Sequence, residues 1–334
     1  MDIDAFAIRH AGRWNRLDRL ARQRKLTVAE VDELLELHQA TATDLSLVRT
    51  ALPDTELIGR LSATLALSRS ALTAPRVFKW SLIAGFFTTK LPAALYRSRR
   101  WWVTVAVMSL LVTFVLGWWL MEHPEVRSVL LPSSDAQQLT QPGGSFETYY
   151  KSAPAQDFAA QVWTNNFFLA LGTLFSGPLL GLPIIYMLWE NAANLGLTGA
   201  YMIAAGRGDV FFTLILPHGM LELTSFFVAA GAGLKLGWSI INPGPRTRLA
   251  ALEEEGRITS VVGIGMVCTL LCTGIIEAFV TPSNLPPAAR IGIGALAELA
   301  FLLYVFVVGR NAYLRGETGD VGAEDKVDAL PVVG

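Results

Sequence analysis

Two residues that could do chemistry stand four positions apart inside an apolar stretch. The segment LPHGMLELTSFF, residues 216–227, contains His218 and Glu222. Side chains at positions i and i+4 share one face of a helix. A helix through this segment would therefore bring an imidazole and a carboxyl close together among apolar neighbours.

Three mechanisms fit this pair. The two side chains can form a structural clamp with the amides of Asn191 or Asn194, because amides inside a membrane hydrogen-bond across helices. With Glu277 or Glu298 they can ligate a metal ion, although a zinc site wants at least three ligands and an HExxH motif is absent. They can also relay protons or bind a polar substrate, since histidine titrates near neutral pH. We assign no catalytic residue, metal or cofactor, and the candidate site is an intramembrane polar cluster of His218, Glu222, Asn191, Asn194, Glu190, Glu277 and Glu298.

The elements that position these residues are predicted to cross a membrane. Of the 334 residues, 52% are hydrophobic and only 16% are charged, whereas soluble domains are about a quarter charged. The stretch 102–121 has no charged residue, and about 20 apolar residues span a bilayer as a helix. The composition therefore predicts an all-α, polytopic membrane bundle with an N-terminal helical domain.

The first 100 residues differ from the rest. They hold 16 of the 27 Lys and Arg residues and a net charge of +6, and they contain no apolar region typical of a secretory signal. Thr27 followed by Glu30 matches a helix-capping box. We predict a cytoplasmic helical domain at 1–75, an amphipathic interfacial helix at 76–100, the transmembrane bundle at 101–310 and a disordered cytoplasmic tail at 311–334.

Six spans are predicted within the bundle. The 46 residues 161–206 contain one charged residue and are too long for one crossing, so the chain must turn in SGPLLGLPI, residues 176–184. Arg246, Arg248 and Arg310 then fall on the cytoplasmic side, as the positive-inside rule requires, with Arg207 outside beside Asp209. Five spans plus a re-entrant segment within 177–206 is the alternative. The expected spans are 102–121, 161–180, 184–206, 211–236, 258–280 and 291–309, with an outer loop at 122–160.

Small residues predict close helix packing. Gly177 and Gly181 form one GxxxG pair, and Gly233 and Gly237 form another. Such pairs let helix backbones approach within a membrane. They are compatible with packing inside one chain and with a homo-oligomer. Lys235, between the second pair, is expected to extend its amine to the cytoplasmic interface.

Several motifs resemble one family of membrane proteins. LPHGMLELTSFFVAAGAGLKLGW at 216–238, the downstream IIEAFVTP and the upstream NAANLG resemble the stage II sporulation protein M family. The N-terminal RWNRLDRL and LLELHQATATDLSLVRTALPD look like its longer branch, which is often encoded beside MoxR-type AAA ATPases. The resemblance matches His218, Gly219, Glu222, Asn194, Glu277 and Pro282 to family motif positions, and it implies a scaffold for peptidoglycan hydrolases in the sporulation member.

The sequence and this resemblance together predict a non-enzymatic scaffold for cell-envelope complexes. We expect a multi-pass protein of the bacterial plasma membrane with both termini cytoplasmic. Its expected partners are the lipid bilayer and envelope or cytoplasmic proteins, a MoxR-type AAA ATPase system among them, and no nucleic acid. The alternatives are a transporter or channel lined by Glu190, His218, Glu222 and Glu298, and an intramembrane metal-dependent enzyme.

Overall fold

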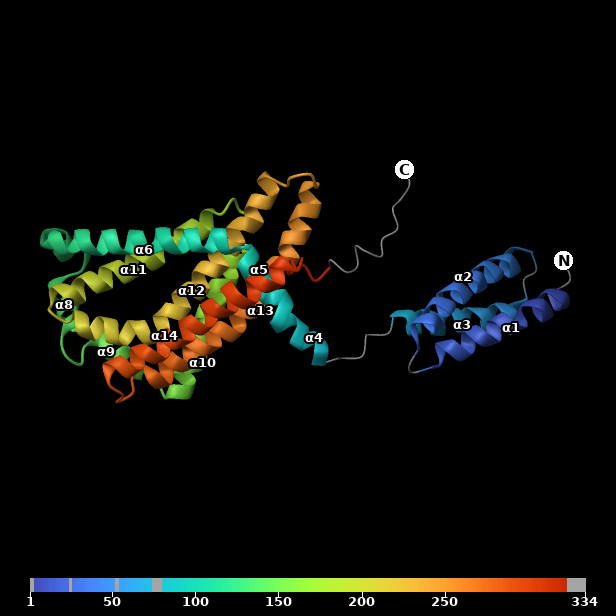
Figure 1. Cartoon of the computed structure of the whole chain (residues 1–334), viewed down its shortest axis with the longest axis horizontal. Coiled ribbons are helices and arrows are strands. Elements are labelled where there is room, and N and C mark those ends of the chain that lie inside the picture. Colours follow the sequence, from blue (N-terminus) through green and yellow to red (C-terminus); the bar gives the residue numbers. More distant parts are fainter. Residues whose placement is uncertain (1–2, 24–25, 52–53, 74–79, 323–334) are drawn as a thin grey trace. The chain divides into compact units, whose positions relative to one another are not determined.

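The computed structural model describes residues 3–23, 26–51, 54–73 and 80–322, and these are helical apart from turns and short connections, with no strand among them. The chain divides into two compact units, residues 1–79 and 80–334. The elements of each unit are drawn in Figure 1. Residues 76–79 of the expected interfacial helix and 323–334 of the expected tail lie outside the described residues.

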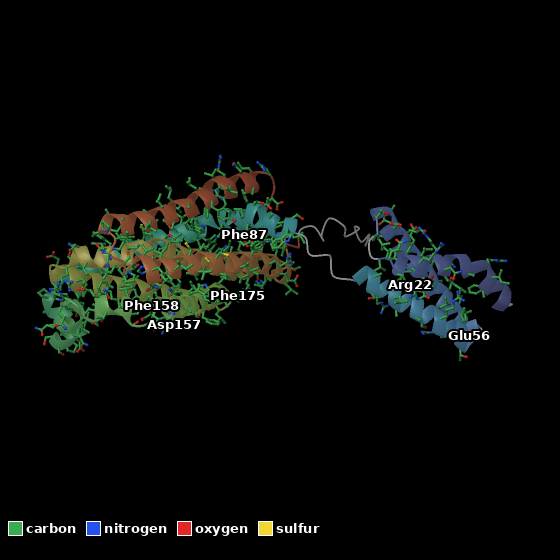
Figure 2. The ribbon with its side chains drawn as sticks, turned by 90° about the horizontal axis from the view of Figure 1, so that it is seen from below. Arg22, Glu56, Phe87, Asp157, Phe158 and Phe175 are labelled. Carbon is green, nitrogen blue, oxygen red and sulfur yellow. The ribbon has the colours of Figure 1, made fainter. Side chains whose placement is uncertain are left out.

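The N-terminal unit is a three-helix domain built from α1 (Ile3–Ala21), α2 (Val28–Ala51) and α3 (Thr55–Thr73). Leucines at helical spacing form its core, and Leu17, Leu20, Leu34 and Leu61 are fully buried. The capping box is present: the Thr27 backbone amide donates to Glu30, and the Glu30 amide donates to the Thr27 hydroxyl. Figure 2 shows Arg22 and Glu56 on the surface of this unit.

The second unit is a helix bundle. Its long helices are α6 (Arg99–Glu122), α10 (Ala155–Phe175), α11 (Leu182–Ala204), α12 (Gly208–Ile241), α13 (Arg248–Ile275) and α14 (Pro287–Leu303). Figure 2 shows α10 running from Asp157 and Phe158 to Phe175. Four helical segments are long and apolar enough to cross a membrane: Arg99–Glu122, Gly208–Ile241, Arg248–Val280 and Pro287–Leu314. The protein is therefore a multi-pass membrane protein. Helices α10 and α11, which carry several polar residues, are not among these four segments.

The segment before the first long helix is more buried than expected of an interfacial helix. It comprises α4 (Trp80–Gly85), the π-helical turn η1 (Phe86–Lys90) and α5 (Leu91–Arg97). Trp80 and Leu82 are exposed, but Leu91–Leu95 are buried against α13 and against the π-helical turn η4 (Tyr304–Gly309). Only the first part of the expected interfacial helix is therefore exposed, while α5 packs into the bundle.

The expected outer loop is largely helical. Residues 124–151, here called the cap, contain α7 (Pro124–Leu130), α8 (Ser133–Thr140), α9 (Ser145–Thr148) and the 3-10 turn η2 (Tyr149–Lys151). Arg207, at the start of α12, joins the cap to the bundle by donating to the Thr140 carbonyl at 2.8 Å and to the Glu147 carboxylate. The Tyr201 hydroxyl donates to the Arg127 carbonyl. These contacts hold the cap against the bundle.

The chain after α14 is also partly ordered, where a disordered tail was expected. Helix α15 spans Arg310–Leu314, and Asp320 is buried. Arg257 on α13 pairs with Asp320 at 2.6 Å. This ion pair fixes the beginning of the tail on the bundle, and the composition of the segment gives no sign of it.

The two glycine pairs lie against each other. The turn 176–181 after α10 brings Gly177 to α12, where a Cβ on Gly177 would collide with the backbone of Gly233. A Cβ on Gly237 would likewise collide with Gly177. Gly181 begins α11 with φ +70°, a conformation that favours glycine. The turn therefore lies beside the end of α12 that leads into the 242–247 connection, here called the hairpin side of the bundle.

Candidate functional site

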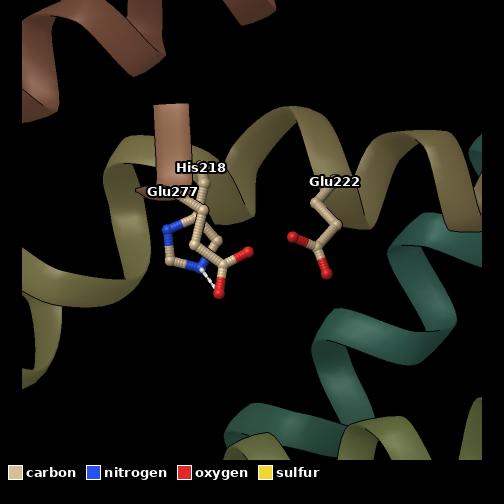
Figure 3. Close-up of side chains that lie close together, drawn as sticks. All are labelled: His218, Glu222 and Glu277. Carbon is tan, nitrogen blue, oxygen red and sulfur yellow. Dashed lines mark ion pairs between the residues drawn. The ribbon is translucent and has the colours of Figure 1, made fainter. Parts of the chain in front are cut away.

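The site is built from one turn of α12 and the end of α13. His218 and Glu222 lie one turn apart on α12, directly after Pro217, whose ring removes a backbone hydrogen bond within the helix. The π-helical turn η3 (Ile276–Val280) continues α13 and carries Glu277. Ligand atoms of the three side chains all lie within 4.8 Å of one another. Figure 3 shows the Glu277 carboxyl between the His218 ring and the Glu222 carboxyl.

Hydrogen bonds orient the His218 ring. Its Nδ1 lies 3.2 Å from the Thr281 hydroxyl, and that hydroxyl can donate to the Ile276 carbonyl at 3.4 Å. Thr281 then accepts from Nδ1–H, a tautomer inferred from the network. The lone pair of Nε2 therefore faces Glu277, whose Oε1 lies 4.0 Å away.

The Glu222 carboxyl is held from α10. Asn166 donates from Nδ2 to Glu222 Oε1 at 2.9 Å, while Glu222 Oε2 is buried with no hydrogen-bond donor among the described residues. The structural clamp was expected to use Asn191 or Asn194, and this was wrong, since the amide comes from α10. The sequence shows Asn166 inside an apolar run, but its spacing does not say which neighbouring helix it faces.

A cavity of about 510 Å³ opens above this cluster on the cap side of the bundle. His218 and Glu222 form its floor, and Asn191 and Asn194 of α11 line one wall. Tyr150 of the cap lies near the floor, its ring centroid 5.7 Å from that of His218. Burial, with Glu277 nearby, raises the pKa of the Tyr150 phenol, so this group remains protonated at neutral pH.

Two expected members of the cluster lie elsewhere. Glu190 is exposed on α11 and does not line this cavity. Glu298 on α14 accepts a hydrogen bond from Thr224 at 2.9 Å and lines a second cavity of about 520 Å³, which is mostly apolar, between α6, α11 and α12. The expected set of seven residues is thus split, and His218, Glu222 and Glu277 form its compact part.

The arrangement brings together one imidazole nitrogen and two carboxylates. His218 and Glu222 line the cavity, and Glu277, which is not among its lining residues, has a carboxylate oxygen within 4.8 Å of both. His218 is 6% exposed and Glu277 4% exposed, so the groups are largely removed from solvent. Three such donors are a common ligand number for a catalytic or exchangeable zinc site. The same groups can also hydrogen-bond a polar ligand in the cavity.

A second polar cluster lies on the hairpin side. The buried carboxyl of Glu255 on α13 pairs with Arg97 at 2.5 Å and with Lys235 at 3.1 Å. Lys235 was expected to extend to the interface, but its amine instead meets Glu255, which lies across from it on α13. Sequence reasoning missed this partner because Glu255 stands in an ordinary acidic run, EEE at 253–255.

Two family models match the chain. One, described as stage II sporulation protein M, covers residues 106–282 and includes His218, Glu222 and Glu277. The other, described as a domain of unknown function (DUF8413), covers residues 4–74 and thus the three helices of the N-terminal unit. No curated protein and no solved structure matches the chain.

Proposed function

We propose that this chain, which belongs to the stage II sporulation protein M family, is a non-enzymatic scaffold that assembles envelope proteins at a bacterial plasma membrane. The observation that carries the proposal is the attached cap. Tyr201 of α11 and Arg207, in the connection between α11 and α12, tie separate helices of the cap to the bundle. A surface held in one shape binds a partner at a smaller entropic cost than a flexible loop does.

The proposed topology gives the scaffold one partner surface on each side of the membrane. Six crossings would put the cap outside and both termini in the cytoplasm. Helices α10 and α11 have 21 and 23 residues, which at 1.5 Å per residue is roughly the 30 Å thickness of a hydrocarbon core. The three-helix unit would then meet cytoplasmic partners, with a MoxR-type AAA ATPase as the candidate.

Transport has less support than scaffolding. A path lined by Glu190, His218, Glu222 and Glu298 requires one water-filled cavity that joins them. The cavity under the cap reaches only His218 and Glu222 of these four, while Glu298 lines a separate, mostly apolar cavity. A non-transporting role accounts for the separation without further assumptions.

The cap offers an exposed apolar contact that can be tested. Val129 is 83% exposed and Leu130 is 54% exposed at the end of α7. Exposed apolar side chains on an outer domain are candidates for contact with a partner. We propose the double variant Val129→Asp with Leu130→Asp in the full chain, assayed by crosslinking in intact cells followed by pull-down.

The expected result is loss of the envelope proteins recovered with the parent chain. The matched control is Leu249→Asp, an exposed leucine at the start of α13 on the hairpin side, which should recover the same envelope partners as the parent. Monodisperse elution in detergent establishes that each variant is folded. Equal recovery of envelope proteins by the parent and the cap variant would contradict the proposal.

A further inference from the structure

We propose that His218, Glu222 and Glu277 bind one divalent transition-metal ion of the zinc or manganese class at the floor of the cavity beneath the cap. The inference concerns binding alone and does not depend on the scaffold function. It rests on four observations within the described part of the chain: the donor atoms converge, some of their acceptor sites receive no hydrogen bond, no cationic side chain pairs with the carboxyls, and other side chains orient the ligands.

The atoms that the three side chains turn toward one another are all hydrogen-bond acceptors: Nε2 of His218 and the carboxylate oxygens of Glu222 and Glu277. His218 Nδ1 is engaged by Thr281, so the lone pair of Nε2 points at the Glu277 carboxyl 4.0 Å away. Glu277 is nine-tenths buried and receives no hydrogen bond from the described residues. Acceptors in contact repel unless a proton or a metal ion lies between them.

No basic side chain compensates the two carboxyls. Among the described residues, no Lys or Arg lies within 4.0 Å of Glu222 or Glu277. Arg290 of α14 is nearby but donates to the Thr281 carbonyl at 2.7 Å, and Arg207 is engaged by the cap. Asn166 from α10 and Tyr150 from the cap are neutral. Buried charge without a partner is unfavourable, and a divalent cation would neutralise both carboxylates.

The ligands are oriented as metal ligands usually are. A ligating histidine commonly bonds its second ring nitrogen to an oxygen, and a ligating carboxylate commonly accepts a further hydrogen bond. Thr281 and Asn166 fill these two roles here. Zinc ligand atoms lie about 2.0–2.2 Å from the ion, so the present spread of up to 4.8 Å must shorten on binding, and the proposal requires the two glutamate side chains to rotate toward the ion.

The donor set indicates the class of metal. One imidazole nitrogen with two carboxylate oxygens suits zinc or manganese, whereas a site for copper(I) would want cysteine or methionine sulfur. Calcium and magnesium prefer sites made entirely of oxygen. Three protein ligands leave a coordination position for water or an oxygen atom of another ligand. His218 and Glu222 line the cavity, so we expect that ligand to come from the cavity.

The test uses the full chain purified in detergent and stripped with a chelator. The protein is titrated with Co²⁺ alone, read by visible absorption, and with Zn²⁺ alone, read by elemental analysis after desalting. We expect about one equivalent of metal per chain. Glu277→Gln and His218→Gln each remove a ligand and should abolish stoichiometric binding, and Thr281→Val should weaken it about 10- to 100-fold.

The matched controls make the same substitution outside the cluster. Glu298→Gln and Glu190→Gln should bind metal as the parent chain does, because neither residue reaches the site. Binding of less than a fifth of an equivalent by the parent chain would overturn the proposal. So would equal binding by the parent and by Glu277→Gln, which would indicate an adventitious ion only. Failure of the parent chain to bind metal overturns the proposal even if a variant fails to fold.

Discussion

The amide of Asn166 on α10 donates to the carboxyl of Glu222 on α12 across 2.9 Å. This bond links one polar helix outside the set of four spans to a helix within that set. We predict that Asn166→Ala destabilises the protein by roughly 1–3 kcal/mol, because the Glu222 carboxyl is then buried with neither oxygen satisfied. Thermal unfolding in detergent measures the change.

The neighbouring residue provides the control for this variant. Asn165 is exposed on the same helix. Among the described residues, its side chain makes one hydrogen bond, which it donates to the Asn166 side chain. Asn165→Ala should therefore leave the midpoint almost unchanged. If the two alanine variants unfold at the same temperature, the Asn166–Glu222 bond contributes nothing to stability.

A second prediction concerns the contact between the glycine pairs. The Cβ of Gly233→Ala would lie 2.7 Å from the Leu174 carbonyl oxygen and 2.9 Å from that of Thr173. Backbone atoms cannot move aside as a flexible side chain can, so we expect a loss of about 1–3 kcal/mol from overpacking. Unfolding of the full chain in detergent reports this loss.

Gly172 on α10 is the matched control for that substitution. A Cβ at this helical position meets nothing within 4 Å. Gly172→Ala should therefore be neutral or should stabilise the helix by about 0.5–1 kcal/mol. We expect opposite signs for the two Gly→Ala changes. Equal destabilisation by both would show that the close backbone contact at Gly233 is not the cause.

A third prediction concerns the ion cluster on the hairpin side. Glu255 is 5% exposed and lies between Arg97 and Lys235. Glu255→Ala would remove the acidic partner of Lys235 and the nearer acidic partner of Arg97, which keeps Glu254 at 3.7 Å. Breaking a buried pair in this way typically costs about 3–5 kcal/mol. Glu253 is an exposed residue in the same acidic run, so Glu253→Ala should leave the unfolding midpoint almost unchanged. Equal unfolding midpoints for the two variants would show that the cluster does not stabilise the bundle.

The sequence predicted features that depend on local spacing. Helical periodicity, the Thr27–Glu30 capping box and the turn near Gly177 are properties of short segments, and the structure contains all three. The sequence also singled out His218, Glu222 and Glu277, because charge within an apolar run is visible without a fold.

Other features depend on which helices become neighbours. Asn166, Thr281 and Glu255 acquire their roles from partners 56, 63 and 158 positions away. Nothing in the local pattern distinguishes them from similar residues nearby. The helical cap was missed for a related reason: its Pro-, Gly- and Ser-rich composition is typical of a loop, while contacts with α11 and α12 hold it. Arg207, expected beside Asp209, is held by this cap instead.

A fourth prediction concerns the acid stability of the N-terminal unit. Hydrogen bonding from Arg16 lowers the pKa of Glu33, and the backbone amide and hydroxyl of Thr27 lower the pKa of Glu30. Because these folded pKa values lie below the ordinary value of 4.5, the unfolded unit binds protons more tightly. The stabilisation is therefore complete above about pH 4.5 and is lost as the pH falls through the lower folded values.

Hydrogen exchange of α2 amides in the full chain, corrected for intrinsic rates, measures this loss between pH 6 and pH 3. The double variant Glu30→Gln with Glu33→Gln should be less protected than the parent at pH 6 and should depend less on pH. Glu36→Gln, at an exposed position on the same helix, serves as the control and should follow the parent. A double variant that loses protection with falling pH as steeply as the parent would exclude these two carboxyls as the cause.

A fifth prediction distinguishes six membrane crossings from four. Gly177 lies against Gly233 and Gly237. These two glycines stand 15 and 19 residues along α12 from His218, which is roughly 23 and 29 Å at 1.5 Å per residue. If α12 crosses the membrane, the turn 176–181 must then lie on the hairpin side, and α10 and α11 must cross as well.

The experiment starts from a chain in which Cys268 and Cys272 are replaced with alanine. Single cysteines are then introduced at exposed positions by Ser134→Cys in the cap, Leu179→Cys in the turn and Leu249→Cys at the hairpin. In intact cells, an impermeant thiol reagent should label only the cap variant, and the other two should react after permeabilisation. Labelling of the turn variant together with the cap variant would rule out six crossings and the placement of the turn on the hairpin side.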